Sequence, residues 1–334
     1  MVENQSVAAG NRPADERLQK QSGLRRLLSR PELGAIAGTV LVFLFFGATA
    51  NGTGMFAADG IMSWVTVTAQ LTIIATGAAL LMVGGEFDLS VGSMIGFAGM
   101  MIAIPTVYFG WPVELSVLFA FCGALLIGFL NGLIVVRTRL PSFIVTLASL
   151  YILRGMTIAL SILFANRTIV SGVKNFAGDS FMVPLFSGKA FYGLFVWLAD
   201  AGVIGKLPNG QPAVQGIPAV VIWAFAIALT GHVVLTRTRF GNWIFGAGGD
   251  ANAARNVGVP VARVKIVLFM ATAFCATVYA TCQVMEFGSA AADRGVLKEF
   301  EAIIAAVIGG CLLTGGYGSV VGAFFGALIF GVVQ

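Results

Sequence analysis

Long apolar runs alternate with short polar or glycine-rich stretches along most of the chain. A helix that crosses a bilayer needs roughly 20 apolar residues, and about nine runs approach or reach that length. They predict an all-α, polytopic transmembrane protein with about nine spans. The runs are Gly34–Ala50, Trp64–Val83, Gly92–Phe109, Val113–Val136, Pro141–Phe164, Ile217–Leu235, Val264–Val284, the short Phe300–Leu313, and a last one from Val320 to Gln334. Because this last run has no polar anchor, we expect the natural chain to continue past Gln334, or this sequence to end early.

The composition agrees with a membrane protein and excludes a water-soluble globule. Of the 334 residues, 58% are hydrophobic and 10% are charged, whereas soluble domains carry about 25% charged residues. A bilayer solvates apolar side chains directly, so little polar surface is needed. The four cysteines lie in apolar runs without metal-ligand spacing, and His232 is the single histidine. We therefore expect buried thiols and no metal site.

The basic residues indicate how the spans are oriented. Cytoplasmic loops carry an excess of Lys and Arg, and most of the 20 such residues lie inside when the N-terminus is cytoplasmic. This interpretation divides the chain into a basic cytoplasmic segment, residues 1–33, and a transmembrane domain, residues 34–334. It places residues 165–216 in an outside loop and residues 236–263 in a cytoplasmic loop. A short surface helix is expected on the outside loop, near Phe191 to Trp197.

Two glycine-rich stretches interrupt the apolar pattern in a similar way. GGEFDLSVG occupies Gly84–Gly92, and GGYGSVVG occupies Gly315–Gly322. Small residues at four-residue spacing allow close helix packing in lipid. The helix-packing glycines predicted on this basis are Gly92, Gly96, Gly318, Gly322 and Gly326. The shared pattern is typical of the internal duplication found in many transporters.

Glu86, Asp88 and Ser90 lie in the first of these breaks. Non-helical backbone at membrane depth is tolerated where it is buried in protein or lines a watery cavity. We therefore take these three residues, with Arg154 inside the fifth run, as candidates for a translocation path. Two alternatives stay open: Asp88 caps the helix that follows, and Arg154 extends to the outer interface. Three other polar residues within spans are expected to form hydrogen bonds between helices: Gln70, Asn131 and His232.

The loop before the seventh run contains the signature of a short exposed helix. Asp250 is a good N-cap, residues 251–257 favour a helix, Gly258 suits the position after it, and Pro260 follows. Two turns are too few to be stable alone in water, so a partner surface would explain them; an ordinary connector is the alternative. The residues assigned to the partner contact are Asp250, Ala251, Ala253, Ala254, Arg255, Asn256 and Gly258. The sequence contains no G-x-x-x-x-G-K-[ST] motif, so an ATP-driven cycle would need a separate ATPase subunit.

Four stretches of the sequence, in this order, carry a specific resemblance. They are Gly84–Ser93 (GGEFDLSVGS), Arg239–Val259 (RFGNWIFGAGGDANAARNVGV), Glu301–Gly310 (EAIIAAVIGG) and Gly315–Gly326 (GGYGSVVGAFFG). Together they resemble the permease subunits of ribose- and xylose-type ABC sugar importers. The likeness extends over about residues 34–334, and the second stretch resembles the family's cytoplasmic coupling loop.

The resemblance implies a non-enzymatic, multi-pass subunit of an importer in the cell inner membrane. Such permeases are homodimers with about ten helices per copy, so this chain has one helix fewer, and its outside loop is longer. Two ATPase subunits, which hold ATP and Mg²⁺, would dock on the coupling loop. A periplasmic binding protein would deliver a monosaccharide or related polyol. No cofactor in this chain and no nucleic-acid partner are expected.

Two other kinds of protein are alternatives to an ABC importer. An ion-coupled secondary transporter would use Glu86, Asp88 and Arg154 as coupling charges. A non-transporting scaffold would not need polar breaks at membrane depth. The coupling-loop signature and the scarcity of intramembrane acids favour the ABC importer.

Overall fold

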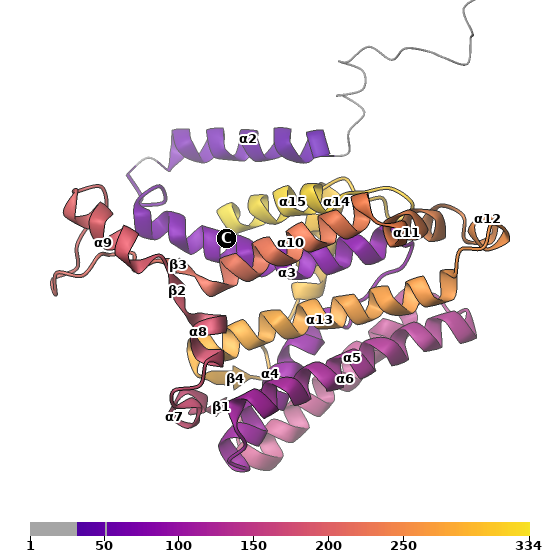
Figure 1. Ribbon diagram of the computed structural model, residues 1–334, viewed down its shortest axis with the longest axis horizontal. Helices are drawn as coiled ribbons and strands as arrows, with labels where there is room; N and C mark the ends of the chain where they lie inside the picture. The colour runs from indigo at the N-terminus through magenta and orange to yellow at the C-terminus, as the bar shows by residue number, and fades with distance from the viewer. Residues whose placement is uncertain (1–31, 51) are drawn as a thin grey trace, which may run out of the picture.

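The long helices run side by side as a bundle in the computed structural model, which describes residues 32–50 and 52–334 (Figure 1). The basic residues before position 32, on which part of the predicted orientation rests, lie outside the described residues. Seven helices in the described part are long and apolar enough to cross a membrane. They are α2 (Glu32–Thr49), α3 (Ala58–Val83), α4 (Val91–Tyr108), α5 (Val113–Thr138), α6 (Ser142–Ala165), α10 (Ala219–Arg237) and α13 (Val261–Phe287). The chain is therefore a polytopic helical membrane protein.

Two shorter helices occupy the last two predicted runs. α14 (Lys298–Ile308) has 11 residues and α15 (Val320–Val333) has 14, which is less than a typical spanning length. Each of the nine predicted runs thus contains a helix, while a count of nine spans stays a prediction. The eighth run was expected to remain apolar helix to Leu313, but α14 ends at Ile308 and a glycine-containing turn follows.

Prolines fix the starts of four long helices. Pro112, Pro141, Pro218 and Pro260 stand directly before α5, α6, α10 and α13. A proline holds φ near the helical value and donates no N–H, so it suits the beginning of a helix and disfavours the interior. This local signal explains why the predicted and observed starts of these helices agree closely.

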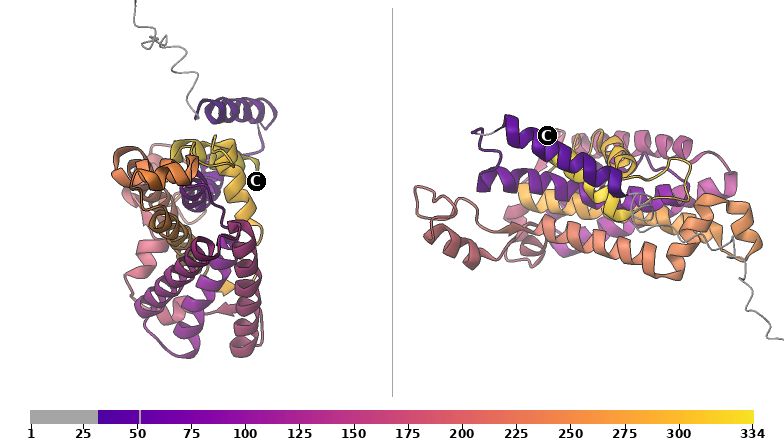
Figure 2. Two further views of the ribbon diagram at one scale, coloured as in Figure 1. Left: turned by 90° about the vertical axis from the view of Figure 1, so that its right-hand side faces the viewer. Right: turned by 90° about the horizontal axis from the view of Figure 1, so that it is seen from above.

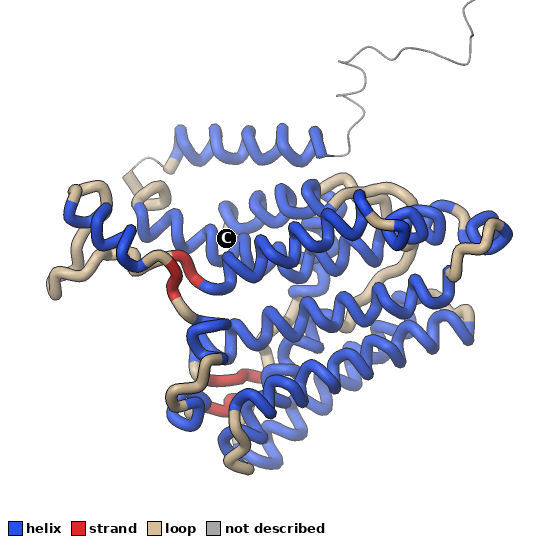
Figure 3. Tube along the Cα trace, in the orientation of Figure 1, coloured by secondary structure: helices blue, strands red, loops and turns tan. Residues whose placement is uncertain are grey.

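Short strands and helices gather at one end of the bundle (Figure 3). They are β1 (Ile169–Ser171), α7 (Val173–Ala177), α8 (Met182–Ser187), β2 (Lys189–Ala190), α9 (Tyr192–Asp200), β3 (Ile217–Pro218) and β4 (Ser289–Ala291). β1 pairs with β4 and β2 with β3, both antiparallel. The all-α prediction did not include these strands, and the expected helix at residues 217–218 is wrong because β3 pairs with β2 there. α9 confirms the surface helix expected on the long loop.

Two further short helices lie at the opposite end of the bundle, α11 (Arg239–Gly249) and α12 (Ala251–Asn256) (Figure 1). The long loop of residues 165–216 and the loop of residues 236–263 are therefore separated by the full length of the long helices. α2 lies apart at the edge of the bundle (Figure 2). It contacts α15, where the Thr39 hydroxyl approaches the Phe325 carbonyl oxygen at 3.4 Å.

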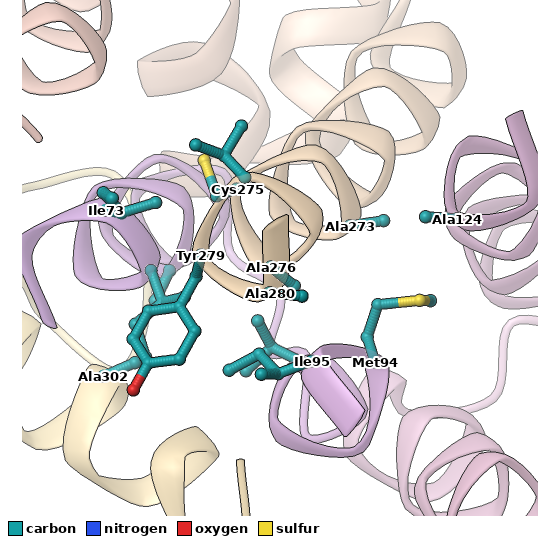
Figure 4. Packing of buried hydrophobic residues seen from close by; sticks show 14 of the residues in the cluster. Ile73, Met94, Ile95, Ala124, Ala273, Cys275, Ala276, Tyr279, Ala280 and Ala302 are labelled. Carbon is teal, nitrogen blue, oxygen red and sulfur yellow. The ribbon is translucent and has the colours of Figure 1, made fainter. Parts of the chain in front are cut away.

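α3 and α4 form the centre of the bundle. Within their most apolar windows, 78% and 83% of residues are buried, against 33% for α5 and 28% for α6. The outer helices expose large apolar side chains, which a bilayer solvates. Small side chains bring α13 close to its neighbours: Ala273 faces Ala124 of α5, and Ala280 lies beside Ile95 of α4 (Figure 4).

Candidate functional site

The break between α3 and α4 is a non-helical segment, residues 84–90, held by side chains of other helices. Gly85 takes a left-handed φ of +80° at the turn. The Phe87 N–H donates to the Ser142 hydroxyl at 3.0 Å, and the Leu89 N–H donates to the Thr146 hydroxyl at 3.0 Å. Backbone that leaves the helical pattern inside a protein needs such partners. The start of α6 therefore supplies the acceptors that allow α3 and α4 to be discontinuous.

Asp88 is the most densely bonded residue of this break. Its Oδ1 accepts from the Ser90 N–H at 2.9 Å and the Ser90 hydroxyl at 2.6 Å, and its Oδ2 accepts from the Thr272 hydroxyl of α13 at 2.5 Å. The residue is only 7% exposed. The capping alternative is partly supported, because Asp88 bonds a backbone N–H beside α4. That N–H belongs to Ser90, the residue before the helix, so the bond forms a turn rather than a helix cap.

The network around Asp88 extends across two more helices. The Asn131 side-chain amide of α5 donates to the Ser90 hydroxyl at 3.2 Å, and the Ser149 hydroxyl of α6 donates to Asn131 at 2.6 Å. The hydrogen bonding between helices expected for Asn131 is therefore confirmed. The break and three helices, α5, α6 and α13, meet through this one set of polar side chains. Sequence reasoning missed Thr272 and Ser149 because isolated hydroxyls in an apolar run carry no local signal.

Glu86 forms an ion pair with Lys265 on α13. The side chains are 11% and 18% exposed. Lys265 lies just after the predicted cytoplasmic loop, and no local pattern in the sequence pairs it with Glu86. Glu86 is thus neutralised within the chain, at a point where the break meets the first turns of α13.

The two glycine-rich breaks meet each other and the end of α11. A Cβ at Gly248 would collide with the Val83 carbonyl oxygen, and a Cβ at Gly315 would lie 2.7 Å from the Gly85 Cα. The Gly316 N–H donates to the same Val83 carbonyl at 2.8 Å. We call Gly85, Gly248, Gly315 and Gly316 the glycine contact. It joins the break that holds Asp88 to the helix directly before the predicted docking element.

The docking element itself forms as predicted from its cap. Asp250 accepts from the Asn252 N–H at 2.9 Å and the Ala253 N–H at 3.0 Å, and α12 begins at the next residue. Gly258 has a φ of +86°, and the helix ends at Asn256, one residue earlier than predicted. Within the element, Ala254 is buried and Ala251 half-buried, whereas the surface is formed by Asn252, Ala253, Arg255, Asn256, Val257 and Gly258.

Arg154 lies outside the Asp88 network. One of its guanidinium nitrogens is buried and has no partner in the described chain, which disagrees with extension of the side chain to the outer interface. Glu299 of α14 is 2% exposed and has a carboxylate oxygen without a partner among the described residues. Sequence reasoning did not single out Glu299, which directly precedes the eighth apolar run.

The predicted helix-packing glycines make two different kinds of contact. A Cβ at Gly322 would collide with the Gly309 carbonyl and one at Gly326 with the Ala305 carbonyl, so α15 packs tightly on α14. Gly318 precedes α15 and lies against Cys311. Gly92 and Gly96 of α4 instead face the connection between α13 and α14, where the nearest carbonyl oxygens belong to Gly295 and Arg294. The atom nearest to a Cβ at Gly92 is a carboxylate oxygen of Glu299, so the stripe on α4 faces both this irregular segment and the start of α14.

Comparison with known proteins shows the family of the chain. Residues 60–334 match a family described as "Branched-chain amino acid transport system / permease component". The xylose transport system permease protein XylH of Escherichia coli (strain K12) is 32% identical over 327 residues, which cover 88% of this chain and 82% of XylH. The ribose import permease protein RbsC of the same organism is 30% identical, covering 90% and 83%. The inner membrane ABC transporter permease protein YjfF, also from that strain, is 31% identical, covering 81% and 73%. No solved structure matches the chain.

Proposed function

Because this chain belongs to the family of branched-chain amino acid transport system permease components, we propose that it is the membrane-spanning subunit of an ABC importer for a monosaccharide or related polyol. The relatives named for xylose and ribose transport support a sugar as solute. The relative named as an inner membrane ABC permease supports both the energy source and the location in the inner membrane.

The observation that carries the proposal is the connection between an exposed capped helix and a polar break. α12 and the two residues after it present an exposed surface at one end of the bundle, and α11 reaches from there to the α3–α4 break through the glycine contact. An importer driven by a separate ATPase needs such a connection, because force applied by the ATPase must move the part of the membrane domain that opens. Asp250 to Gly258 is accordingly the ATPase-docking element, and ATP and Mg²⁺ belong to the partner subunit.

The remaining assembly follows from this assignment. The end with α12 is cytoplasmic, together with the N-terminus, and the end with α9 and the strands faces the periplasmic binding protein. α14 and α15, each lengthened by its connecting segment, are proposed to cross the membrane once each. Together with the seven long helices of the described residues they make nine spans. A second copy of the chain forms the other half of the membrane channel, as in a homodimeric importer.

Glu86, Asp88 and Ser90 are proposed to belong to the gate of the translocation path. Their bonds to α6 and α13 fix one conformation of the break. The same bonds disfavour ion coupling, because Glu86 already has a cation and Asp88 already has three donors. An ion-coupled transporter would need acids that are free to bind the ion.

The experiment that tests the function is uptake into proteoliposomes. The permease is reconstituted with its ATPase and binding protein, and uptake of labelled xylose, ribose and a pentitol is measured. We expect uptake of at least one solute that requires hydrolysable ATP and persists when ionophores abolish all ion gradients. Uptake by the permease alone, driven by a proton or sodium gradient, would refute the proposal in favour of a secondary transporter.

A further inference from the structure

A polar cavity of about 520 Å³ lies at the end of the bundle that carries the strands and α9. Small-molecule sites commonly measure about 300–1,000 Å³. The walls come from the N-terminal half of α3, the C-terminal end of α13 and the segment from α8 to the start of α10. The lining also contains apolar side chains, and its polar and charged members include Asp59, Ser63, Gln70, Lys189, Gln215 and Glu286. We call it the polar cavity.

The α3 wall is a polar stripe on an otherwise apolar helix. Asp59, Ser63 and Gln70 recur at intervals of four and seven residues, which places them on one face. The deeper half of the same helix, from Leu71 to Val83, is buried throughout and apolar apart from two threonines. The change in character coincides with the cavity, so the stripe faces a polar space rather than lipid.

The walls offer acceptors on one side and donors on the other. Asp59 and Glu286 are exposed at the cavity, and their carboxylates form no ion pair with other described residues. An ionised carboxylate only accepts hydrogen bonds. On the loop side, Lys189 donates to the Gln215 carbonyl oxygen at 3.1 Å and keeps two further N–H donors. Because a sugar hydroxyl both donates and accepts, a polyhydroxylated solute can bond to both sides at once.

The floor of the cavity continues inward as a chain of polar groups. The Tyr279 hydroxyl of α13 lies 3.5 Å from the Gln70 carbonyl oxygen, and the Gln283 amide donates to Tyr279 at 3.0 Å. The carbonyl oxygen of Gln283 is buried without a partner in the described chain. Gln283 lines a separate small void beside α4 rather than the polar cavity.

A second cavity differs from the polar cavity in the chemistry of its lining. It measures about 490 Å³ between α3, α10 and α15, and apolar side chains form most of its lining. A sugar there would leave most of its hydroxyls without partners, which is unfavourable. The polar cavity is therefore the better match to a hydrophilic solute.

We propose that the polar cavity between α3, α13 and the α8–α10 segment is the first site in the membrane subunit where the solute rests, and that its ligand is a small neutral polyol or monosaccharide. Asp59 and Glu286 accept from its hydroxyls, Lys189 donates to them, and Gln70 lies on the route inward. This inference rests on the proposed importer function, which makes this end of the bundle the side of solute entry.

The test compares two charge-neutralising variants in the reconstituted importer. Asp59→Asn combined with Glu286→Gln removes both acceptor charges from the cavity. Asp200→Asn is the matched control, because Asp200, the last residue of α9, pairs with the exposed Lys206 and does not line the cavity. We expect the initial uptake rate to fall at least tenfold in the double variant and to stay within twofold of wild type in the control. Equal rates in all three proteins, or equal losses in both variants, would overturn the cavity assignment.

The wild-type protein separates this inference from the function on which it rests. If the wild-type complex takes up none of a panel of pentoses, hexoses and pentitols with ATP, the proposed function fails. If it transports and the double variant is unchanged, only the cavity fails.

Chemical blocking of an assembled importer covers the case in which the double variant does not accumulate. Ser63→Cys, in a Cys282→Ser background, is treated with a charged, membrane-impermeant thiol reagent after reconstitution. We expect modification to abolish uptake, whereas modification of Asp200→Cys leaves it intact. Complete modification at position 63 with uptake retained would overturn the proposal.

Discussion

At the scale of single residues, Asp88 is held by hydrogen bonds and not by an ion pair. Both carboxylate oxygens have donors, from Ser90 and Thr272, yet no cation pairs with it in the described chain. Glu86, two residues away, is paired with Lys265. The bonds of Asp88 hold the break in its observed conformation.

Asp88→Asn tests the charge while keeping the shape. The side-chain amide that this substitution introduces can accept from Ser90 through its oxygen and donate to Thr272 through its NH₂ group. We therefore expect normal abundance and an uptake rate at least tenfold below wild type. Asp88→Ala, the companion variant, leaves the buried Ser90 hydroxyl and N–H without their acceptor, at a cost of about 1–3 kcal/mol, so its abundance should fall. Wild-type uptake by Asp88→Asn would make Asp88 a dispensable structural residue.

What the sequence could predict about these residues depended on distance along the chain. The Asp250 cap is made with residues two and three positions away, and it was predictable from local pattern. The partners of Glu86 and Asp88 lie 179 and 184 residues away. A lysine near a helix start and a threonine in an apolar run gave no indication of these contacts.

At the scale of elements, the glycine contact connects segments that would otherwise be separate. α11 ends where Gly248 lies against the backbone of α3, and the second break supplies Gly315 and Gly316 to the same place. No side chain larger than hydrogen fits at Gly248 without a shift of backbone. The break and the docking element are therefore positioned by direct backbone contact.

Gly248→Ala should loosen this contact, and Gly249→Ala is its matched control. The added methyl at position 248 meets the Val83 carbonyl oxygen, whereas a Cβ at position 249 has no neighbour within 4 Å. Overpacking of this kind costs about 1–3 kcal/mol. We expect a lower thermal midpoint and at least fivefold slower uptake for Gly248→Ala, with both unchanged in the control. Equal thermal midpoints and equal uptake rates for the two variants would show that the glycine contact does not affect transport.

Ala254→Pro should disrupt the docking helix, and Ala251→Pro should not. Proline at position 254 removes the N–H that donates to the Asp250 carbonyl at 2.9 Å, and a proline inside a helix costs about 3 kcal/mol. Position 251 is the first residue of α12, where proline is tolerated. We expect co-purification with the ATPase to be lost only in Ala254→Pro. Retention of both assembly and uptake in that variant would reduce α12 to a connector.

The long helices were predictable where an apolar run or a proline marked their position in the sequence. The apolar runs located every long helix, because a bilayer demands about 20 apolar residues in each. α11 was missed, since its Trp, Phe and Gly residues form neither a long run nor a capped pattern like that of α12. The β1–β4 pair joins short segments that are distant in sequence, and strands of three residues leave too short a pattern to detect.

At the scale of the whole molecule, function depends on which end faces the cytoplasm. Lys189 lies in β2 at one end and Val257, 81% exposed, follows α12 at the other. A charged thiol reagent added to intact cells should label Lys189→Cys at once. Val257→Cys should react only after permeabilisation, because the charge-based orientation places it inside. Labelling with the opposite pattern would invert the topology.

The central claim is that one chain receives a solute at one end and an ATPase at the other. The most direct measurement is photo-crosslinking of the assembled importer with a photoreactive amino acid at position 257 or at position 189. We expect an adduct with the ATPase from position 257 only, and an adduct with the solute-binding protein from position 189 only. A transport-active complex in which position 257 yields no ATPase adduct, or position 189 yields one, would contradict it.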